Sequence, residues 1–328
     1  MIKVGIFGFG TIGKRVADAV MLQDDMELVG VSVHSYNQRI MTAEKKGFKL
    51  YKTESSSADV QADGTVQDLF AACDVIVDGT PGKMGAENMK LYKAAGVKAI
   101  LQGGEKAETV ECSFNASCNF EEARGKDYVR VVSCNTTALS RVLGSLKEKI
   151  KMGHVAVTLM RRSLDPGQKG KTVMNALMPT FEFPSHHGPD VNTIMPDIDI
   201  STVAFKLPTT LMHAHSLQIE LTEAVTTEAV LDILKNTDRV HVLPKGAGVD
   251  STAHVMELGK DLGQMRGDFM EAAVWEEGVN VSGHTLYITM AVHQESIVVP
   301  DNIDCIRAMC SDTSKEESIT KTNKTLGL

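Results

Sequence analysis

One cysteine stands where a helix is expected to begin, a position that can make a thiol reactive. Cys134 follows the strand-like run Tyr128–Val132 and precedes Asn135-Thr136-Thr137, whose polar side chains are good N-terminal caps. Free N–H groups in a first helical turn favour a thiolate and can stabilise an oxyanion formed when sulfur attacks a carbonyl. Cys134 is therefore a candidate nucleophile, although a cysteine that packs between strand and helix fits the local sequence equally well.

Two histidines offer a base for such a thiol. His213-Ala214-His215 begins a run of alternating polarity, so both rings can share one face of a strand. The spacing also suits a zinc site, and a pair of structural histidines is a third alternative. No further cysteine or acidic cluster stands at ligand spacing, so the pattern favours catalysis over a metal.

Candidate anion holders follow. Arg161-Arg162 ends an expected strand, and Ser185-His186-His187-Gly188 lies in a loop flanked by prolines. Arginine binds phosphate oxygens through a planar fork, which serine and histidine can supplement. Simple solvation of a surface is the alternative. In a chain of net charge -8, an anionic substrate would need such dedicated cations.

A glycine-rich turn predicts a dinucleotide site. Gly8, Gly10 and Gly13 stand in GxGxxG register after a strand and at the start of a helix. The first glycine allows a tight turn, the second lets a pyrophosphate approach, and the third lets helix and strand pack closely. The N–H groups of Thr11 and Ile12 would then face the phosphates. An ordinary tight turn is the weaker alternative.

The end of the second expected strand bears on the choice of cofactor. An Asp or Glu there usually binds the ribose of NAD and repels the 2'-phosphate of NADP. The stretch Val31–Arg39 has no carboxylate and carries the polar or basic residues Ser32, His34, Ser35, Asn37 and Arg39. It predicts that NADP is accepted as well as NAD.

The elements that must position these residues change character along the chain. The first part alternates short apolar strands with amphipathic helices, as in a parallel sheet. Its expected strands are Lys3–Phe7, Leu28–Val33, Val75–Asp78, Ala99–Leu101 and Tyr128–Val132. Its expected helices are Thr11–Gln23, Val66–Cys73, and Ala86–Ala95 closed by Gly96, with a solvated connection over Thr53–Gly64.

Longer alternating strands follow a helix at Thr137–Lys151. They are His154–Arg162, Ser201–Leu207, Ser216–Leu221 and Thr285–His293, with helices at Thr227–Leu234 and Ser251–Leu262. The fold class is α/β: a Rossmann-type doubly wound parallel sheet plus an α+β catalytic domain with a mainly antiparallel sheet. We expect a dinucleotide-binding domain over 1–136, a catalytic domain over 137–298, and a C-terminal helix over 299–328 that starts near Pro300, runs past Cys310 and returns to the first domain.

Composition excludes several classes of protein. The 328 residues are 43% hydrophobic and 23% charged, typical of a folded globular chain. A pI near 5.7 predicts no nucleic-acid partner, and no apolar run approaches the ~20 residues that span a membrane. Met1 leads directly into a strand, which predicts a cytoplasmic protein, and the six scattered cysteines predict reduced thiols.

Together these motifs resemble the archaeal type of phosphorylating glyceraldehyde-3-phosphate dehydrogenase, over nearly the whole chain. The blocks that carry the resemblance are Gly10–Ala19, Gln102–Lys106, Ser133–Thr137, Pro184–Asp190, Pro208–His213, Ala291–Ser296 and Lys321–Lys324. Several such blocks in one order are highly specific.

The resemblance implies oxidation of glyceraldehyde 3-phosphate, with inorganic phosphate, to 1,3-bisphosphoglycerate in glycolysis or gluconeogenesis by a homotetramer that uses NAD or NADP. It implies that Cys134 is the nucleophile and that His213, rather than His215, is the base. The implied substrate contacts are Ser133, Asn135, Arg161, His186 and His187. The implied cofactor contacts include Gly104, Arg162 and Gln294.

Two other functions stay open at this point. Aspartate-semialdehyde dehydrogenase, or another acyl-phosphate reductase, would share the fold and the cysteine chemistry but recognise a different substrate. A non-catalytic dinucleotide-binding redox sensor would use Cys134 alone. The Ser-His-His-Gly and Cys-Asn-Thr-Thr strings favour the triose phosphate, and a sensor has no need of His213.

Overall fold

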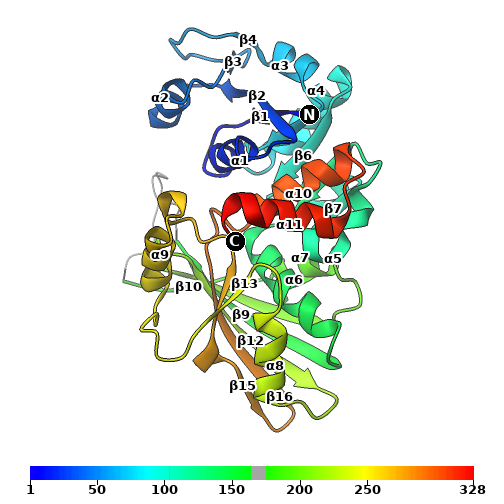
Figure 1. The fold of residues 1–328 in the computed structure, drawn as a ribbon, viewed down its shortest axis with the longest axis vertical. Coiled ribbons are helices and arrows are strands. Elements are labelled where there is room, and N and C mark those ends of the chain that lie inside the picture. Colours follow the sequence, from blue (N-terminus) through cyan, green and yellow to red (C-terminus); the bar gives the residue numbers. More distant parts are fainter. Residues whose placement is uncertain (103, 164–174) are drawn as a thin grey trace. The chain divides into compact units, whose positions relative to one another are not determined.

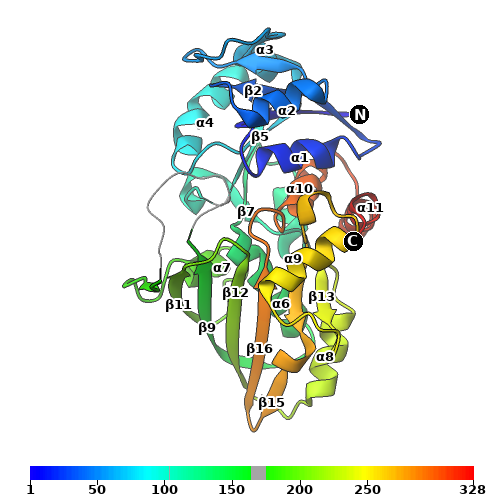
Figure 2. The ribbon, with the colours of Figure 1, turned by 90° about the vertical axis from the view of Figure 1, so that its left-hand side faces the viewer.

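The computed structural model describes residues 1–102, 104–163 and 175–328. These residues form two compact units, each with its own sheet (Figures 1 and 2). The first unit comprises Met1–Ser133 together with Val298–Leu328, and the second comprises Cys134–Ile297. The first unit is thus assembled from two separate stretches of the chain.

The sheet of the first unit is parallel throughout its described pairings. Its order is β4-β3-β2-β1-β5-β6-β8-β7. The strands are β1 (Ile2–Phe7), β2 (Met26–Val33), β3 (Leu50–Lys52), β4 (Gly64–Thr65), β5 (Val75–Asp78), β6 (Lys98–Gln102), β7 (Cys112–Phe114) and β8 (Tyr128–Val131). The chain runs outward from β1 in both directions, so a topological switch point lies between β1 and β5, where such sheets bind ligands.

Helices pack on both faces of this sheet (Figure 1). The helices of this unit are α1 (Gly13–Val20), α2 (Gln38–Lys45), α3 (Val66–Ala72), α4 (Met84–Ala95), α5 (Ala116–Asn119), α10 (Val299–Cys310) and α11 (Lys315–Leu326), with 3₁₀ turns at Ala107–Thr109 and Phe120–Ala123. Successive residues of a strand face opposite sides. Phe7 therefore packs on Phe70 of α3, whereas Ile6 meets Gly13 of α1. This arrangement confirms the predicted doubly wound sheet.

A buried arginine fixes the C-terminal stretch within the first unit. Arg307 of α10 has no exposed surface, and its Nε lies 2.8 Å from Asp25 Oδ2. Its other nitrogens donate to Gln23 Oε1 and to Thr322 Oγ1 of α11. Because a buried guanidinium is costly unless it is paired, these bonds fix where α10 and α11 dock.

The prediction of one final helix running past Cys310 was wrong. Helix α10 ends at Cys310, Ser311 is extended, and α11 begins after Ser314. The Ser314 hydroxyl accepts the N–H of Glu317, which is a typical N-terminal cap. The polar run from Ser311 to Ser314 therefore stops one helix and starts another.

The sheet of the second unit is mixed and mainly antiparallel, as predicted. Its order is β10-β11-β9-β12-β16-β14-β13, with β15 paired to β16. The strands are β9 (Met152–Arg162), β10 (Met178–Pro179), β11 (Ile200–Leu207), β12 (His213–Leu221), β13 (Val240–Leu243), β14 (Ala272–Trp275), β15 (Asn280–Ser282) and β16 (Thr285–Val292). Among the described strands of this sheet, only the pairs β9 with β11 and β13 with β14 are parallel.

Helix α6 (Cys134–Lys147) packs beside α7 (His187–Asn192) and α8 (Thr227–Lys235), as Figure 1 shows. The remaining helical elements are α9 (Thr252–Asp261) and 3₁₀ turns at Met265–Gly267 and Glu276–Gly278. Helix α6 begins three residues before the predicted start. His187 opens α7, where a loop was expected. Cys134 is consequently the first residue of its helix.

Candidate active site

The glycine-rich turn fits a dinucleotide. Gly8 has φ +94°, and a Cβ on it would lie 2.5 Å from the Thr80 nitrogen. A Cβ on Gly13 would lie 2.2 Å from the Gly8 carbonyl oxygen, so helix and strand pack too closely for a side chain there. A Cβ on Gly10 would meet nothing nearer than 3.5 Å. The protein itself does not fill the space at Gly10, which leaves it for a pyrophosphate.

The start of α1 is also free for an anion. Its N-cap, Ile12, has no side chain capable of capping, and the first turn contains no acidic residue. The N–H groups of Thr11 and Ile12 have no acceptor within the described ranges. Unpaired N–H groups at the positive end of a helix dipole are a phosphate site.

The end of β2 contributes in a different way from the one expected. The Ser32 hydroxyl is buried and accepts the Gly8 N–H at 2.8 Å, so it supports the glycine turn. His34 is exposed, and its Nδ1 lies 3.2 Å from Thr53 Oγ1. Asn37 is occupied as the N-cap of α2, where it accepts the Arg39 N–H. His34 and Arg39, which is nearby in sequence, are therefore the basic side chains that remain at this end of β2.

Gly104 lies beside a small cavity of about 50 Å³ at the carboxyl ends of β5 and β6. Asp78, Thr80 and Glu105 also line it. The buried Glu105 carboxylate accepts the N–H groups of Gly85 and Ala86, which caps the start of α4. Gly103, in the middle of the predicted Gln102–Lys106 block, lies outside the described residues.

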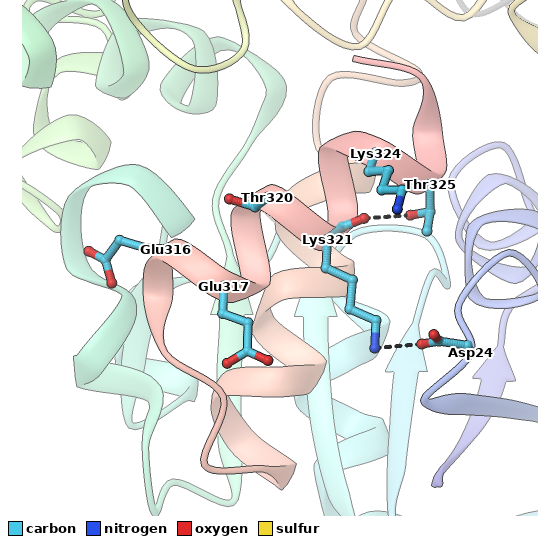
Figure 3. Close-up of a pocket in the computed structure, with 7 residues that line it drawn as sticks. All are labelled: Asp24, Glu316, Glu317, Thr320, Lys321, Lys324 and Thr325. Atoms are coloured by element: carbon cyan, nitrogen blue, oxygen red, sulfur yellow. Dashed lines mark hydrogen bonds and ion pairs between the residues drawn. The ribbon is translucent and has the colours of Figure 1, made fainter.

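A larger hollow of about 550 Å³ lies against α11 in the first unit (Figure 3). Asp24, Glu316 and Glu317 line it together with Lys321 and Lys324. Lys321 is already paired with Asp24 and Asp25. Its charges are mixed, and its described lining residues include no histidine or cysteine, so the hollow lacks the thiol and imidazole that the sequence predicts for the active site.

Cys134 is partly exposed at the first turn of α6. Burial raises the pKa of its thiol to about 11, against the opposing effect of the Arg162 and Arg161 guanidinium groups and of the Asn135 and Cys134 N–H groups. The expected lowering by the helix start is therefore present but outweighed. At neutral pH the resting side chain is a thiol surrounded by groups that favour a thiolate.

His213 is the first residue of β12 and lies against the end of β9. Its Nδ1 accepts the backbone N–H of Arg162 at 3.1 Å. Burial lowers its pKa well below the ordinary value, and the positive charges of Arg162 and Arg161 add to that effect. The ring is neutral, and because Nδ1 accepts, its single proton lies on Nε2.

His215 lies two residues further on the same strand face and is fully buried. Its Nε2 is 2.9 Å from Oδ1 of Asn135, the residue after Cys134. Burial lowers the pKa of His215 to about 3, so this ring is neutral as well. The structure thus joins the predicted His-x-His pair to the predicted helix start.

The predicted anion holders converge in the same unit. Arg161 Nη1 lies 3.4 Å from Nε2 of the buried His187, whose pKa burial lowers to about 2. No carboxylate is paired with Arg161 in the part of the chain that the structure describes, and its buried Nε lacks an acceptor there. Arg162, by contrast, lies 3.6 Å from Glu295. Arg161 is therefore the better candidate for an anion.

Of the two hydroxyl groups beside His187, the sequence predicted that of Ser185 but not that of Thr202. Ser185 Oγ lies 3.1 Å from His187 Nδ1 and 2.8 Å from Thr202 Oγ1, and Thr202 donates to the Ser185 carbonyl. Since Arg161 can only donate, His187 Nε2 must accept and its Nδ1 must carry the proton. Thr202 gave no signal in sequence, because threonine is ordinary in a strand.

The remaining predicted site residues, His186, Ser133 and Gln294, differ in their surroundings. His186 is exposed, stacks on His187 at 4.0 Å, and lies 3.7 Å from Glu182. Ser133 precedes Cys134 directly. Gln294 is buried, and its Oε1 has no donor among the described residues. Within those residues no group of three or more His, Cys, Asp or Glu side chains is placed to hold a metal ion, and no helix is long and apolar enough to cross a membrane.

We expect alkylation of Cys134 by iodoacetamide to accelerate about tenfold per pH unit and to level off only near the thiol pKa of about 11. Arg162→Gln removes a cation that favours the thiolate, so alkylation at about pH 8 should slow by roughly threefold to tenfold. Peptide mass spectrometry measures the rate, with Cys134→Ser as the background. A plateau already reached below about pH 8 would contradict this pKa.

Comparison with known proteins agrees with this arrangement. A family model described as "Glyceraldehyde 3-phosphate dehydrogenase, C-terminal domain" matches residues 133–278, and one described as "Dihydrodipicolinate reductase, N-terminus" matches residues 2–112. The crystal structure of aspartate semialdehyde dehydrogenase II from Vibrio cholerae is similar in fold, with a TM-score of 0.65 at 12% identity, covering 94% of this chain and 97% of that one.

Curated relatives match over the whole chain. Glyceraldehyde-3-phosphate dehydrogenase of Archaeoglobus fulgidus is 49% identical, covering 100% of this chain and 98% of that protein. The enzymes of Thermococcus kodakarensis and Methanopyrus kandleri are each 50% identical, covering 100% of this chain and 99% and 97% of theirs. The chain therefore belongs to the glyceraldehyde-3-phosphate dehydrogenase family in its archaeal type, a family of oxidoreductases.

Proposed function

We propose that this chain is a phosphorylating glyceraldehyde-3-phosphate dehydrogenase that works through a thioester on Cys134. The observation that carries the proposal is the juxtaposition of a helix-start thiol with Arg161, a guanidinium that has no acidic partner among the described residues. An anion is needed to balance that charge, and both substrates, a triose phosphate and inorganic phosphate, supply one.

The first step is addition of sulfur to the aldehyde. The Cys134 proton leaves to solvent, the thiolate forms a C–S bond to the carbonyl carbon, and the carbonyl oxygen becomes an alkoxide. The Arg162 and Arg161 charges and the N–H groups of Asn135 and Cys134 favour the thiolate. The step therefore draws on groups already in place in the second unit.

His213 acts here as a donor. The sequence-based hypothesis made it the base that takes the substrate hydroxyl proton. With Nδ1 occupied by the Arg162 N–H, however, the neutral ring offers only the N–H at Nε2. That group can stabilise the alkoxide, and an adduct that remains an alkoxide needs no base before it is oxidised.

A nicotinamide dinucleotide, which the family and the glycine turn imply, supplies the hydride acceptor when it is bound. Oxidation of the alkoxide restores a C=O bond and leaves a thioester on Cys134. A phosphate oxygen then attacks the thioester carbon, the C–S bond breaks, and the thiolate is released with 1,3-bisphosphoglycerate as product. Arg161, Arg162, His186 and His187 are the proposed holders of phosphate groups, with Ser133 and Asn135 flanking the substrate.

For the cofactor, Gly8, Gly10, Gly13, Thr11 and Ile12 would hold the pyrophosphate. Ser32 would support their turn, and His34 would face the ribose. Gly104 and Gln294 are proposed on the nicotinamide side, and Arg162 beside neighbouring groups of the cofactor. No carboxylate stands in Val31–Arg39, so we propose that NADP is accepted beside NAD.

The alternatives are not favoured. The likeness to an aspartate semialdehyde dehydrogenase concerns the fold alone, at 12% identity. A redox sensor would have no use for the unpaired Arg161 or for His213. Location in the cytoplasm, the homotetramer and the boundaries 1–136, 137–298 and 299–328 stay predictions of the sequence.

Glyceraldehyde 3-phosphate should sustain cofactor reduction over many turnovers only when inorganic phosphate is present, and Cys134→Ser should abolish this turnover because the thioester cannot form. Absorbance at the nicotinamide band measures the reaction, and cofactor fluorescence should show nearly unchanged binding in the variant. Aspartate semialdehyde serves as the control substrate. Faster turnover of aspartate semialdehyde, or full activity of Cys134→Ser, would refute the proposal.

If His213 acts as a hydrogen-bond donor, substitution by Gln and by Ala should affect activity differently. Gln places an amide N–H close to where Nε2 lies, so His213→Gln should retain more activity than His213→Ala, which should lose roughly 10²- to 10³-fold in kcat. Neither side chain can act as a base. Steady-state kinetics with saturating phosphate decide the matter, and equal losses in the two variants would restore the base hypothesis.

Cofactor choice should respond to charge at His34. His34→Asp places a carboxylate at the end of β2, so the KM for NADP should rise about tenfold or more while the KM for NAD changes little. His34→Asn is the matched neutral control, since it has the same shape without the charge. If Asp and Asn affect both cofactors alike, the 2'-phosphate does not lie at this strand end.

A further inference from the structure

His215 is a buried side chain that the proposed chemistry does not use. It lies on β12 with no exposed surface, and its hydrogen bond goes to the Asn135 side chain, 2.9 Å from Nε2 to Oδ1. An amide oxygen can only accept, so His215 Nε2 must donate. Nδ1 is then an acceptor, and no donor reaches it in the described part of the chain.

The opposite orientation of the pair is unfavourable. If the Asn135 amide were reversed, its NH₂ would donate to His215 Nε2, and the ring proton would move to Nδ1. That N–H would be fully buried without an acceptor among the described residues. A buried donor without an acceptor is rarer in proteins than an acceptor that lacks a donor. The orientation with Oδ1 toward His215 is the one that leaves only a lone pair unsatisfied.

The orientation decides what Asn135 presents to its other side. The residue is 4% exposed, and its Nδ2 has no acceptor among the described residues. Nδ2 is also absent from the fully enclosed unpaired atoms of those residues, so it retains access to a ligand. The backbone N–H of the same residue favours the Cys134 thiolate. An oxygen bonded to the carbon that Cys134 attacks would supply the acceptor that this amide lacks.

We propose that His215 is a positioning residue that holds Asn135 by its oxygen, so that the carboxamide offers only N–H donors to the oxygen of the substrate bound at Cys134. This inference rests on the proposed function and deepens it. A neutral ring suits the task, because burial lowers the pKa of His215 to about 3 and keeps the hydrogen bond unchanged across the working range of pH. His215 would act through Asn135 and never touch the substrate.

Substitutions at both positions test the coupling. His215→Phe keeps the ring and removes the donor, so kcat should fall about tenfold with little change in KM, while Asn135→Ala should lose roughly 10²-fold. In the double variant the loss should equal that of Asn135→Ala alone, because His215 then has nothing to position. His215→Gln, whose amide nitrogen lies where Nε2 was, should recover most of the activity.

Asn135→Asp probes the direction of the hydrogen bond. His215 would hold one carboxylate oxygen, and the other would face the substrate oxygen as an acceptor. Activity should therefore be lower than in Asn135→Ala, although Asp is the closer mimic in shape. Activity of Asn135→Asp at or above that of Asn135→Ala would overturn the proposal, as would losses that multiply in the double variant.

A control separates positioning from loosening of the strand. Leu217 lies two residues beyond His215 on the same buried face of β12. Leu217→Val should lower the unfolding temperature while kcat is retained. If His215→Phe lowers kcat only in proportion to the loss of folded protein, as measured by thermal unfolding, the role is structural and the proposal fails.

Spectra of the ring nitrogens test the inference independently of turnover. In protein labelled with ¹⁵N-histidine, the His215 signals, assigned from their absence in His215→Phe, should show a protonated Nε2 and a bare Nδ1. Asn135→Ala should shift the Nε2 signal. A proton on Nδ1 would overturn the proposal. If glyceraldehyde 3-phosphate is not oxidised but these signals appear as expected, the proposed function fails while the orientation of Asn135 stands.

Discussion

The chemistry of the second unit depends on keeping hydrogen-bond donors unpaired in a partly buried place. Arg161 has no acidic partner among the described residues, and the first turn of α6 presents its N–H groups to Cys134. Unpaired buried donors destabilise a folded chain, so they persist only where the surrounding structure fixes them. Here the ends of β9 and β12 supply that rigidity, because each strand continues into a paired sheet. A ligand that accepts hydrogen bonds relieves the cost.

His187, His213 and His215 are all buried, but they differ in which ring nitrogen donates a hydrogen bond. All three rings are neutral, so none adds to the positive charge of the arginines, and each is distinguished by where its single proton lies. The backbone of Arg162 leaves the proton of His213 on Nε2, Arg161 leaves that of His187 on Nδ1, and Asn135 fixes that of His215 on Nε2. The hydrogen-bond partners, rather than the residue type, therefore determine which nitrogen of each ring donates and which accepts.

Sequence alone predicted the parallel sheet, the mainly antiparallel sheet that follows it and the glycine turn, because periodicity and turn chemistry are local properties. It missed α2 and several short strands, among them β3, β4, β7 and β15, and it placed the start of α6 three residues late. The protonation state of Cys134 could not be predicted either. The sequence indicates the helix start, which lowers the pKa of the thiol, whereas the burial that raises this pKa more strongly depends on packing. The bonds from Thr202 to Ser185 and from His215 to Asn135 join distant segments, so no local pattern reports them.

The first unit is completed by a stretch separated from it by the whole of the second. During synthesis on the ribosome, β5, β6 and β8 emerge long before α10, the helix that later covers them. Gln23 and Asp25 likewise lack their hydrogen-bond partner Arg307 until it is synthesised more than 280 residues later. The nascent sheet must therefore expose apolar surface while Cys134–Ile297 is translated, and it becomes a candidate for chaperone binding at that stage.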